Sequence, residues 1–176
     1  MDDFLLGVFQ GELRTQCNFI TFGGGMLNHI VPQLKEHQTA NAIWFALQGI
    51  LVSAANASKL LWGSKTTEDL DERQRLRESV GVDEQSPLYS RKLRNDFEHF
   101  DERIKTWADG NTQRIYVRRS IGPRDRLVVV GNEPIKDPFG IYDPETAKVT
   151  FWDREVALQP IITEADRIIK IIDQTR

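Results

Sequence analysis

The stretch 40–62 constrains the fold more than any other part of the chain. It is long and mainly apolar, and apolar residues occupy much of its helical circumference, which is typical of a helix in the middle of a bundle. A membrane span would need about 20 mainly apolar residues. We expect instead a buried bundle helix and no membrane partner, because polar residues interrupt the stretch at intervals. These residues are Asn41, Gln48, Ser53, Asn56, Ser58 and Lys59.

Apolar residues at helical spacing predict further helices on both sides of this stretch. The first helix is expected to end at Gly23, Gly24 and Gly25, which we interpret as a flexible turn. Residues 26–34 are expected to form a short helix or an ordered connector. The predicted helices cover residues 4–22, 40–62, 67–80, 87–109 and 160–174.

Two of these helices carry start signals in the sequence. Thr66 and Asp69 have the spacing of a capping box, so a helix should begin at residue 67. Ser86 before Pro87 places a capping hydroxyl ahead of a proline at the first helical position. Gly110 is expected to close that second helix in the left-handed conformation.

The region before the last helix has a different pattern. β-branched and aromatic residues bounded by turn residues predict two hairpins, one from 114–118 and 126–130 and the other from 139–142 and 148–152. The chain is therefore predicted to be one mainly α domain over residues 1–176. We expect a helical bundle of four or five helices with a small antiparallel β insertion, at about 112–157, before the last helix.

The composition narrows the compartment and the chemistry. Cys17 is the only cysteine, so the chain can form no intramolecular disulfide and lacks the ligands of a zinc knuckle. We interpret Cys17 as a small apolar filler on its helix, in a reducing, cytoplasmic environment. The acidic N-terminus lacks the basic region of a signal peptide. Neither a cofactor nor a metal is expected.

The net charge of −3 conceals a local excess of positive charge. Residues 114–126 contain five arginines and one acid, and such local patches set the field that a ligand meets. The segment fits two functions equally, guiding an RNA backbone or shielding exposed strand edges from aggregation. The candidate RNA-binding residues are Arg114, Tyr116, Arg118, Arg119, Arg124 and Arg126.

The predicted helix 87–109 carries the one concentrated chemical signal. Its candidate catalytic residues are Arg94, Asn95 and His99. On a helix Asn95 and His99 lie one above the other, so the amide can hold the imidazole in one tautomer. Arg94 and His99 lie about 140° apart around the axis, so one copy of the helix does not easily aim both at one atom. Two copies across a two-fold axis would place each arginine beside the other chain's histidine.

These residue types suit the cleavage of RNA by its own 2′-hydroxyl group without a metal. Histidine titrates near neutrality and can accept or donate a proton. Arginine stays charged and matches phosphate oxygens in a bidentate way. The segment resembles the HEPN superfamily of helical bundles, whose motif is an arginine, a polar residue such as asparagine, and a histidine a few residues further on. Arg94, Asn95 and His99 match that motif.

The resemblance implies a bundle of four or five helices and a homodimer in which two motifs form one cleft. It also implies metal-independent endoribonuclease activity on RNA and a toxin or defence role. Whether a protein partner neutralises the activity stays open. Two other functions stay open. One is a non-catalytic helical module for interaction and dimerisation, with Arg94 and His99 as interface residues, and the other is a nucleotide-binding sensor that holds phosphate without cutting.

Overall fold

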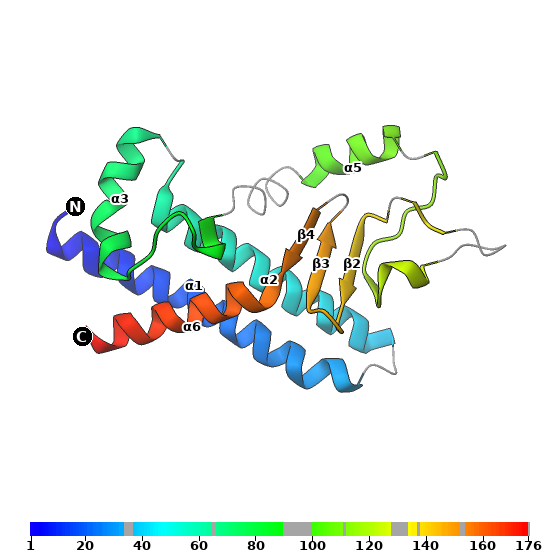
Figure 1. Ribbon diagram of the computed structural model, residues 1–176, viewed down its shortest axis with the longest axis horizontal. Helices are drawn as coiled ribbons and strands as arrows, with labels where there is room; N and C mark the ends of the chain where they lie inside the picture. The colour runs from blue at the N-terminus through cyan, green and yellow to red at the C-terminus, as the bar shows by residue number, and fades with distance from the viewer. Residues whose placement is uncertain are drawn as a thin grey trace.

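The computed structural model describes residues 1–33, 37–64, 66–89, 100–110, 112–127, 134–136, 138–151 and 154–175. It confirms a mainly helical fold with a small sheet before the last helix (Figure 1). In chain order the elements are α1 (Asp3–Ile30), η1 (Val31–Gln33), α2 (His37–Trp62), α3 (Thr67–Ser79), η2 (Pro87–Tyr89), α5 (Phe100–Gly110), β1 (Ser120–Ile121), η3 (Arg124–Arg126), β2 (Gly140–Asp143), β3 (Lys148–Phe151), β4 (Arg154–Ala157) and α6 (Leu158–Gln174).

The helices α1 and α2 form the centre of the molecule. They run side by side in opposite directions, and α6 packs against α1 (Figure 1). Asn56 on α2 donates a hydrogen bond to Gln16 on α1, with 3.4 Å between Nδ2 and Oε1. The prediction that the stretch 40–62 is a central bundle helix is confirmed. The core between the helices contains fully buried side chains, including Leu13, Ile20, Ile43, Leu47, Ile50, Leu61, Ile161 and Ile168.

The prediction that three glycines end the first helix is wrong. Helix α1 continues through them to Ile30 and includes most of the predicted connector 26–34. The reason is tertiary packing, since a Cβ at Gly23 would lie 2.6 Å from Cγ1 of Ile50 on α2. A Cβ at Gly24 would lie 3.0 Å from Cδ1 of Ile162 on α6. The glycines therefore let two neighbouring helices approach the backbone of α1 closely.

The predicted start of α3 is confirmed. Thr66 is its N-cap, and its hydroxyl oxygen accepts a hydrogen bond from the Asp69 N–H at 3.2 Å. The Asp69 carboxylate in turn accepts from the Ser64 N–H and from the Thr66 hydroxyl, at 2.9 and 3.0 Å. These bonds lower the pKa of Asp69. Gly81 follows the helix in the left-handed region, with φ of +60°.

The predicted helix 87–109 is confirmed only at its end. Pro87–Tyr89 is a 3₁₀ turn, and α5 covers Phe100–Gly110. Residues 90–99 lie outside the described residues. The Ser86 hydroxyl accepts a hydrogen bond from the Leu88 N–H at 3.3 Å, as expected of a cap. Gly110 is the last residue of α5 and does not have a positive φ, so the predicted left-handed closure is wrong.

The sheet has the order β1-β2-β3-β4 and is mixed. Strands β2, β3 and β4 pair in antiparallel fashion, which confirms the second predicted hairpin. The short strand β1 pairs in parallel with β2, so the prediction of a purely antiparallel insertion is wrong. The first predicted hairpin is also wrong in its described part. Arg114 and Arg119 have φ of +55° and +66°, which interrupts a continuous strand, and residues 124–126 form a 3₁₀ turn.

Within the described residues, one helical stretch is long and apolar enough by composition to cross a membrane. It is Thr39–Trp62, with a mean hydropathy of 1.2. Half of the apolar window is buried inside the fold, and the core helix of a bundle passes the same test of length and composition. The expected lack of a membrane partner therefore stays a prediction.

Candidate nucleic-acid interface

The three candidate catalytic residues lie outside the described residues. Arg94, Asn95 and His99 fall in the chain between η2, which ends at Tyr89, and α5, which begins one residue after His99. Their predicted roles stay predictions. The described elements on both sides nevertheless show where the chain enters and leaves this segment.

An aromatic cluster joins α5 to the sheet and to the basic segment. Trp107 on α5 is buried and makes an edge-to-face contact with Tyr116, with 5.0 Å between ring centroids. The ring of Phe139 lies 6.1 Å from Trp107 and 5.5 Å from Tyr116. Phe151 on β3 extends the cluster, 5.1 Å from Phe139. The helix that follows the candidate motif is therefore packed directly against one of the candidate RNA-binding residues, Tyr116, which is half exposed.

The structure brings together two of the candidate RNA-binding arginines. Arg118 and Arg119 line an open cavity of about 320 Å³ against the N-terminal half of α2. One guanidinium nitrogen of Arg119 donates a hydrogen bond to the Asn41 side-chain oxygen at 3.3 Å. The remaining described lining residues are Trp44, Phe45 and Gln48. Two cations thus share a cavity with aromatic rings and neutral amides.

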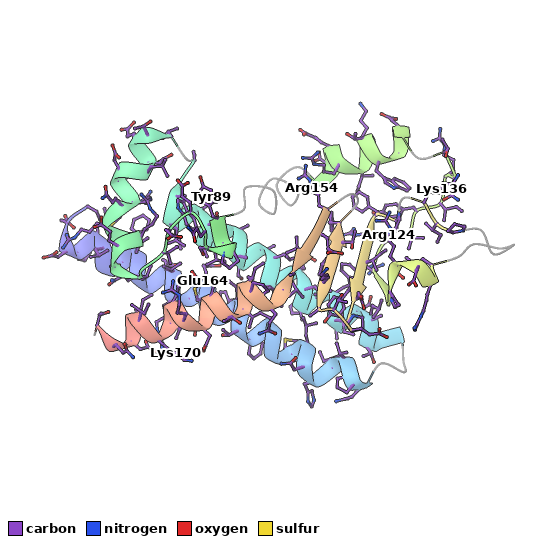
Figure 2. All side chains as sticks on the ribbon, in the orientation of Figure 1. Tyr89, Arg124, Lys136, Arg154, Glu164 and Lys170 are labelled. Atoms are coloured by element: carbon purple, nitrogen blue, oxygen red, sulfur yellow. The ribbon has the colours of Figure 1, made fainter. Side chains whose placement is uncertain are left out.

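Arg124 belongs to a different place on the surface. Its guanidinium donates to the Lys136 carbonyl oxygen at 3.0 Å, and Figure 2 shows the two residues at the end of the molecule that carries the sheet. It lines a smaller cavity, of about 130 Å³, together with Lys148 and Glu155. Those two side chains form an ion pair of 2.6 Å. The described lining of these two cavities includes neither Arg114 nor Arg126. The six candidates therefore do not form one continuous site around a single cavity.

The sequence interpretation missed the contribution of α2 to the larger cavity. Asn41, Phe45 and Gln48 are spaced four and three residues apart, so they lie on one helical face. That spacing was the available signal. From the sequence alone, Asn41 and Gln48 are polar interruptions of a core helix. Only the fold shows that the face they share meets Arg118 and Arg119.

Cys17 has the environment expected of an apolar filler. It is fully buried in the core between α1 and its neighbours. Burial, together with the nearby charge of Glu164, raises the pKa of its thiol to about 12. The thiol is therefore protonated at neutral pH and unsuited to act as a nucleophile.

The described residues place no group of three His, Cys, Asp or Glu side chains where they could hold a metal ion. No protein-family model, curated protein or solved structure matches the chain. The resemblance to the HEPN superfamily consequently depends on the spacing of Arg94, Asn95 and His99 in the sequence.

Proposed function

We propose that the protein is a metal-independent endoribonuclease of the HEPN type that acts as a homodimer on single-stranded RNA. The observation that carries the proposal is the motif of Arg94, Asn95 and His99. In this mechanism His99 carries the proton, Asn95 orients the imidazole, and Arg94 binds the phosphate whose negative charge grows in the transition state.

The reaction needs no co-reactant other than the RNA itself. The 2′-oxygen attacks the adjacent phosphorus and loses its proton to a basic group, for which the imidazole of His99 is suited. The bond from phosphorus to the 5′-oxygen breaks, and that oxygen takes a proton from an acidic group. The products are a 2′,3′-cyclic phosphate and a 5′-hydroxyl end. In a dimer, one histidine can act as the base and its counterpart as the acid.

Helix α5, which follows the motif in the chain, supports an RNA substrate by the residues it contacts. Helix α5 begins one residue after His99, and Trp107 lies eight residues beyond His99 in the chain. At 1.5 Å per residue, the span from the start of α5 to Trp107 is about 10 Å. Trp107 contacts Tyr116, two residues before Arg118. The helix that continues the chain from the motif therefore packs against a segment that carries both aromatic and cationic side chains.

An exposed apolar face on α1 supports the dimer. Phe4, Phe19 and Phe22 are 81%, 54% and 69% exposed, and helical spacing puts them on one side of α1 with Val8. At about 200 Å² for each phenylalanine side chain, the three expose about 400 Å². A standard interface buries about 800 Å² per partner, of which about 65% is apolar in homodimers. The face thus supplies most of the apolar area that a second copy of the chain would cover.

The test is cleavage of a labelled, mixed-sequence RNA in the presence of EDTA. The wild type should cut, and His99→Ala should not. The matched control is His29→Ala, because His29 is an exposed histidine on α1 that does not belong to the motif, and its imidazole lies 3.4 Å from the Gln33 amide. The control should cut at the wild-type rate and leave cyclic-phosphate ends.

Two outcomes would overturn the proposal. Cleavage that persists in a clean preparation of His99→Ala would remove His99 from the mechanism. The absence of cleavage by the wild type would favour the interaction module, in which the exposed face of α1 and the residues Arg94 and His99 bind protein. Loss of dimerisation in Arg94→Ala or His99→Ala, measured by light scattering, would identify that second function.

A further inference from the structure

The cavity between α2 and the segment that holds Arg118 and Arg119 is lined by cationic, aromatic and amide side chains. Its volume is about 320 Å³, within the range of small-ligand pockets. Phe45 is 72% exposed, so its ring is available to a planar ligand. No acid is among the described residues that line the cavity, which are Asn41, Trp44, Phe45, Gln48, Arg118 and Arg119.

We propose that this cavity binds one nucleotide of a single-stranded RNA, with the base on Phe45 and the phosphate between Arg118 and Arg119. The inference depends on the proposed function, because it names residues outside the cleavage motif that would hold the same RNA substrate. Nucleic-acid bases stack on aromatic side chains largely without regard to sequence. Arginine binds phosphate in a bidentate way. The side-chain amides of Asn41 and Gln48 can donate and accept hydrogen bonds at the edges of an unstacked base.

The backbone holds the arginines at α2 by several independent contacts. The Phe139 and Gly140 N–H groups both donate to the Val117 carbonyl, at 2.7 and 3.2 Å, so the chain is tied to β2 just before Arg118. Arg119 has a φ of +66°, a backbone conformation that residues with a side chain rarely adopt. Such conformations persist where the surroundings impose them, and they cluster at functional sites. The guanidinium of Arg119 is directed to α2 by its hydrogen bond to Asn41.

The start of β2 lies against this side of α2. A Cβ at Gly140 would be in ordinary van der Waals contact with Cη2 of Trp44 at 3.4 Å and with the Arg119 backbone nitrogen at 3.6 Å. Trp44 lines the cavity, and its indole N–H is buried and donates to no atom of the described chain. Buried donors without an acceptor are uncommon in folded proteins.

The charge of the lining distinguishes this cavity from another of similar size. A cavity of about 310 Å³ beside α3 includes Glu78, Asp83 and Glu84 in its lining, and these carboxylates would repel a phosphate. The polar groups that line the cavity at α2 are instead two guanidinium groups and two neutral amides. Of the two, the cavity at α2 is therefore suited to an anionic ligand with an aromatic part.

The test measures binding without cleavage. The wild-type protein is titrated into a fluorescein-labelled 2′-O-methyl oligouridine, which has no free 2′-hydroxyl to attack phosphorus, and the anisotropy is recorded. Phe45→Leu keeps an apolar side chain but removes the ring, and should weaken binding about 5- to 100-fold. Phe45→Trp keeps a stacking surface and should bind like the wild type. Arg119→Gln should lower the slope of log affinity against log salt by about 0.7, the value for one phosphate contact on a single strand.

The outcomes separate this proposal from the proposed function. If the wild type cuts ordinary RNA but Phe45→Leu and Arg119→Gln bind like the wild type, the nucleotide site is wrong and the ribonuclease proposal stands. If only Arg119→Gln weakens binding, the cavity is an anion site that inorganic phosphate should also occupy, and the assignment of a base to Phe45 fails. If both variants weaken binding and Phe45→Trp does not, the site is supported even where cleavage is absent.

Discussion

The three consecutive glycines of α1 provide a sharp test of the fold, because an added methyl group meets a different environment at each position. Nothing lies within 4 Å of a Cβ at Gly25. A Cβ at Gly24 would meet the far end of the Ile162 side chain at 3.0 Å. A Cβ at Gly23 would lie 2.6 Å from Cγ1 of the fully buried Ile50 and 3.3 Å from the Ala46 carbonyl oxygen.

The expected magnitudes follow from two opposing effects. Replacing glycine by alanine inside a helix stabilises it by about 1 kcal/mol. Nothing opposes this gain at Gly25, so Gly25→Ala should raise the free energy of unfolding by about that amount. Forcing a methyl group into a filled contact costs about 1–3 kcal/mol. Gly23→Ala should therefore be less stable than Gly25→Ala by about 1–3 kcal/mol, with Gly24→Ala between them.

The assay is thermal unfolding followed by circular dichroism, with urea unfolding as a second measure. For a chain of this size, 1 kcal/mol shifts the melting temperature by about 2–4 °C. If all three variants destabilised the protein, the triplet would be the flexible turn that the sequence pattern predicts, with glycine needed for its backbone angles. Equal stabilisation by all three would show a continuous helix that α2 and α6 do not approach closely.

Two substitutions and one labelling experiment test other parts of the fold. Thr66→Ala should lower the free energy of unfolding in urea by about 1 kcal/mol, because it removes the N-cap of α3; an unchanged midpoint would contradict the cap. Cys17 should react with a thiol reagent only as fast as the protein unfolds, since burial raises its pKa to about 12, and rapid reaction of the folded protein at pH 8 would refute this. The pKa of Glu164 lies below its ordinary value of 4.5, chiefly because Arg167 donates hydrogen bonds to the carboxylate. The stability that this carboxylate contributes is therefore present above pH 4.5 and is lost as the pH falls through the folded pKa. The stability difference between wild type and Glu164→Gln should therefore shrink in acid, and a difference that grew would exclude the ion pair as its source.

The elements that could be predicted from the sequence are those whose signals are local. The capping pair of Thr66 and Asp69 places the start of α3 correctly, because both partners lie within one turn. The last helix was predicted for residues 160–174 and runs over Leu158–Gln174. The hairpin of β2 and β3 is predicted from β-branched and aromatic residues around a tight turn, and these two strands pair in antiparallel fashion. Each of these predictions needed only residues that are neighbours along the chain.

The failures occur where distant residues decide the local structure. A glycine triplet locally indicates a break, yet Gly23 and Gly24 lie inside α1, where Ile50 and Ile162 on two other helices approach the backbone closely. The segment 114–118 has the composition of a strand, but the positive φ of Arg114 and Arg119 and the contacts of Val117 with β2 prevent a regular hairpin. The cavity at α2 could not be predicted for the same reason, because it combines residues of α2 with arginines that follow about 70 positions later in the chain.

The polar residues of α2 favour a bundle helix over a membrane span in the sequence. In the fold, two of them form hydrogen bonds with other parts of the chain. Asn41 accepts a hydrogen bond from Arg119, and Asn56 donates one to Gln16. Gln48 lies between them in sequence and lines the cavity with Arg118. The opposite side of the same helix packs Ile43, Leu47 and Ile50 into the core, so α2 both stabilises the bundle and supplies the aromatic and amide groups of the proposed nucleotide site.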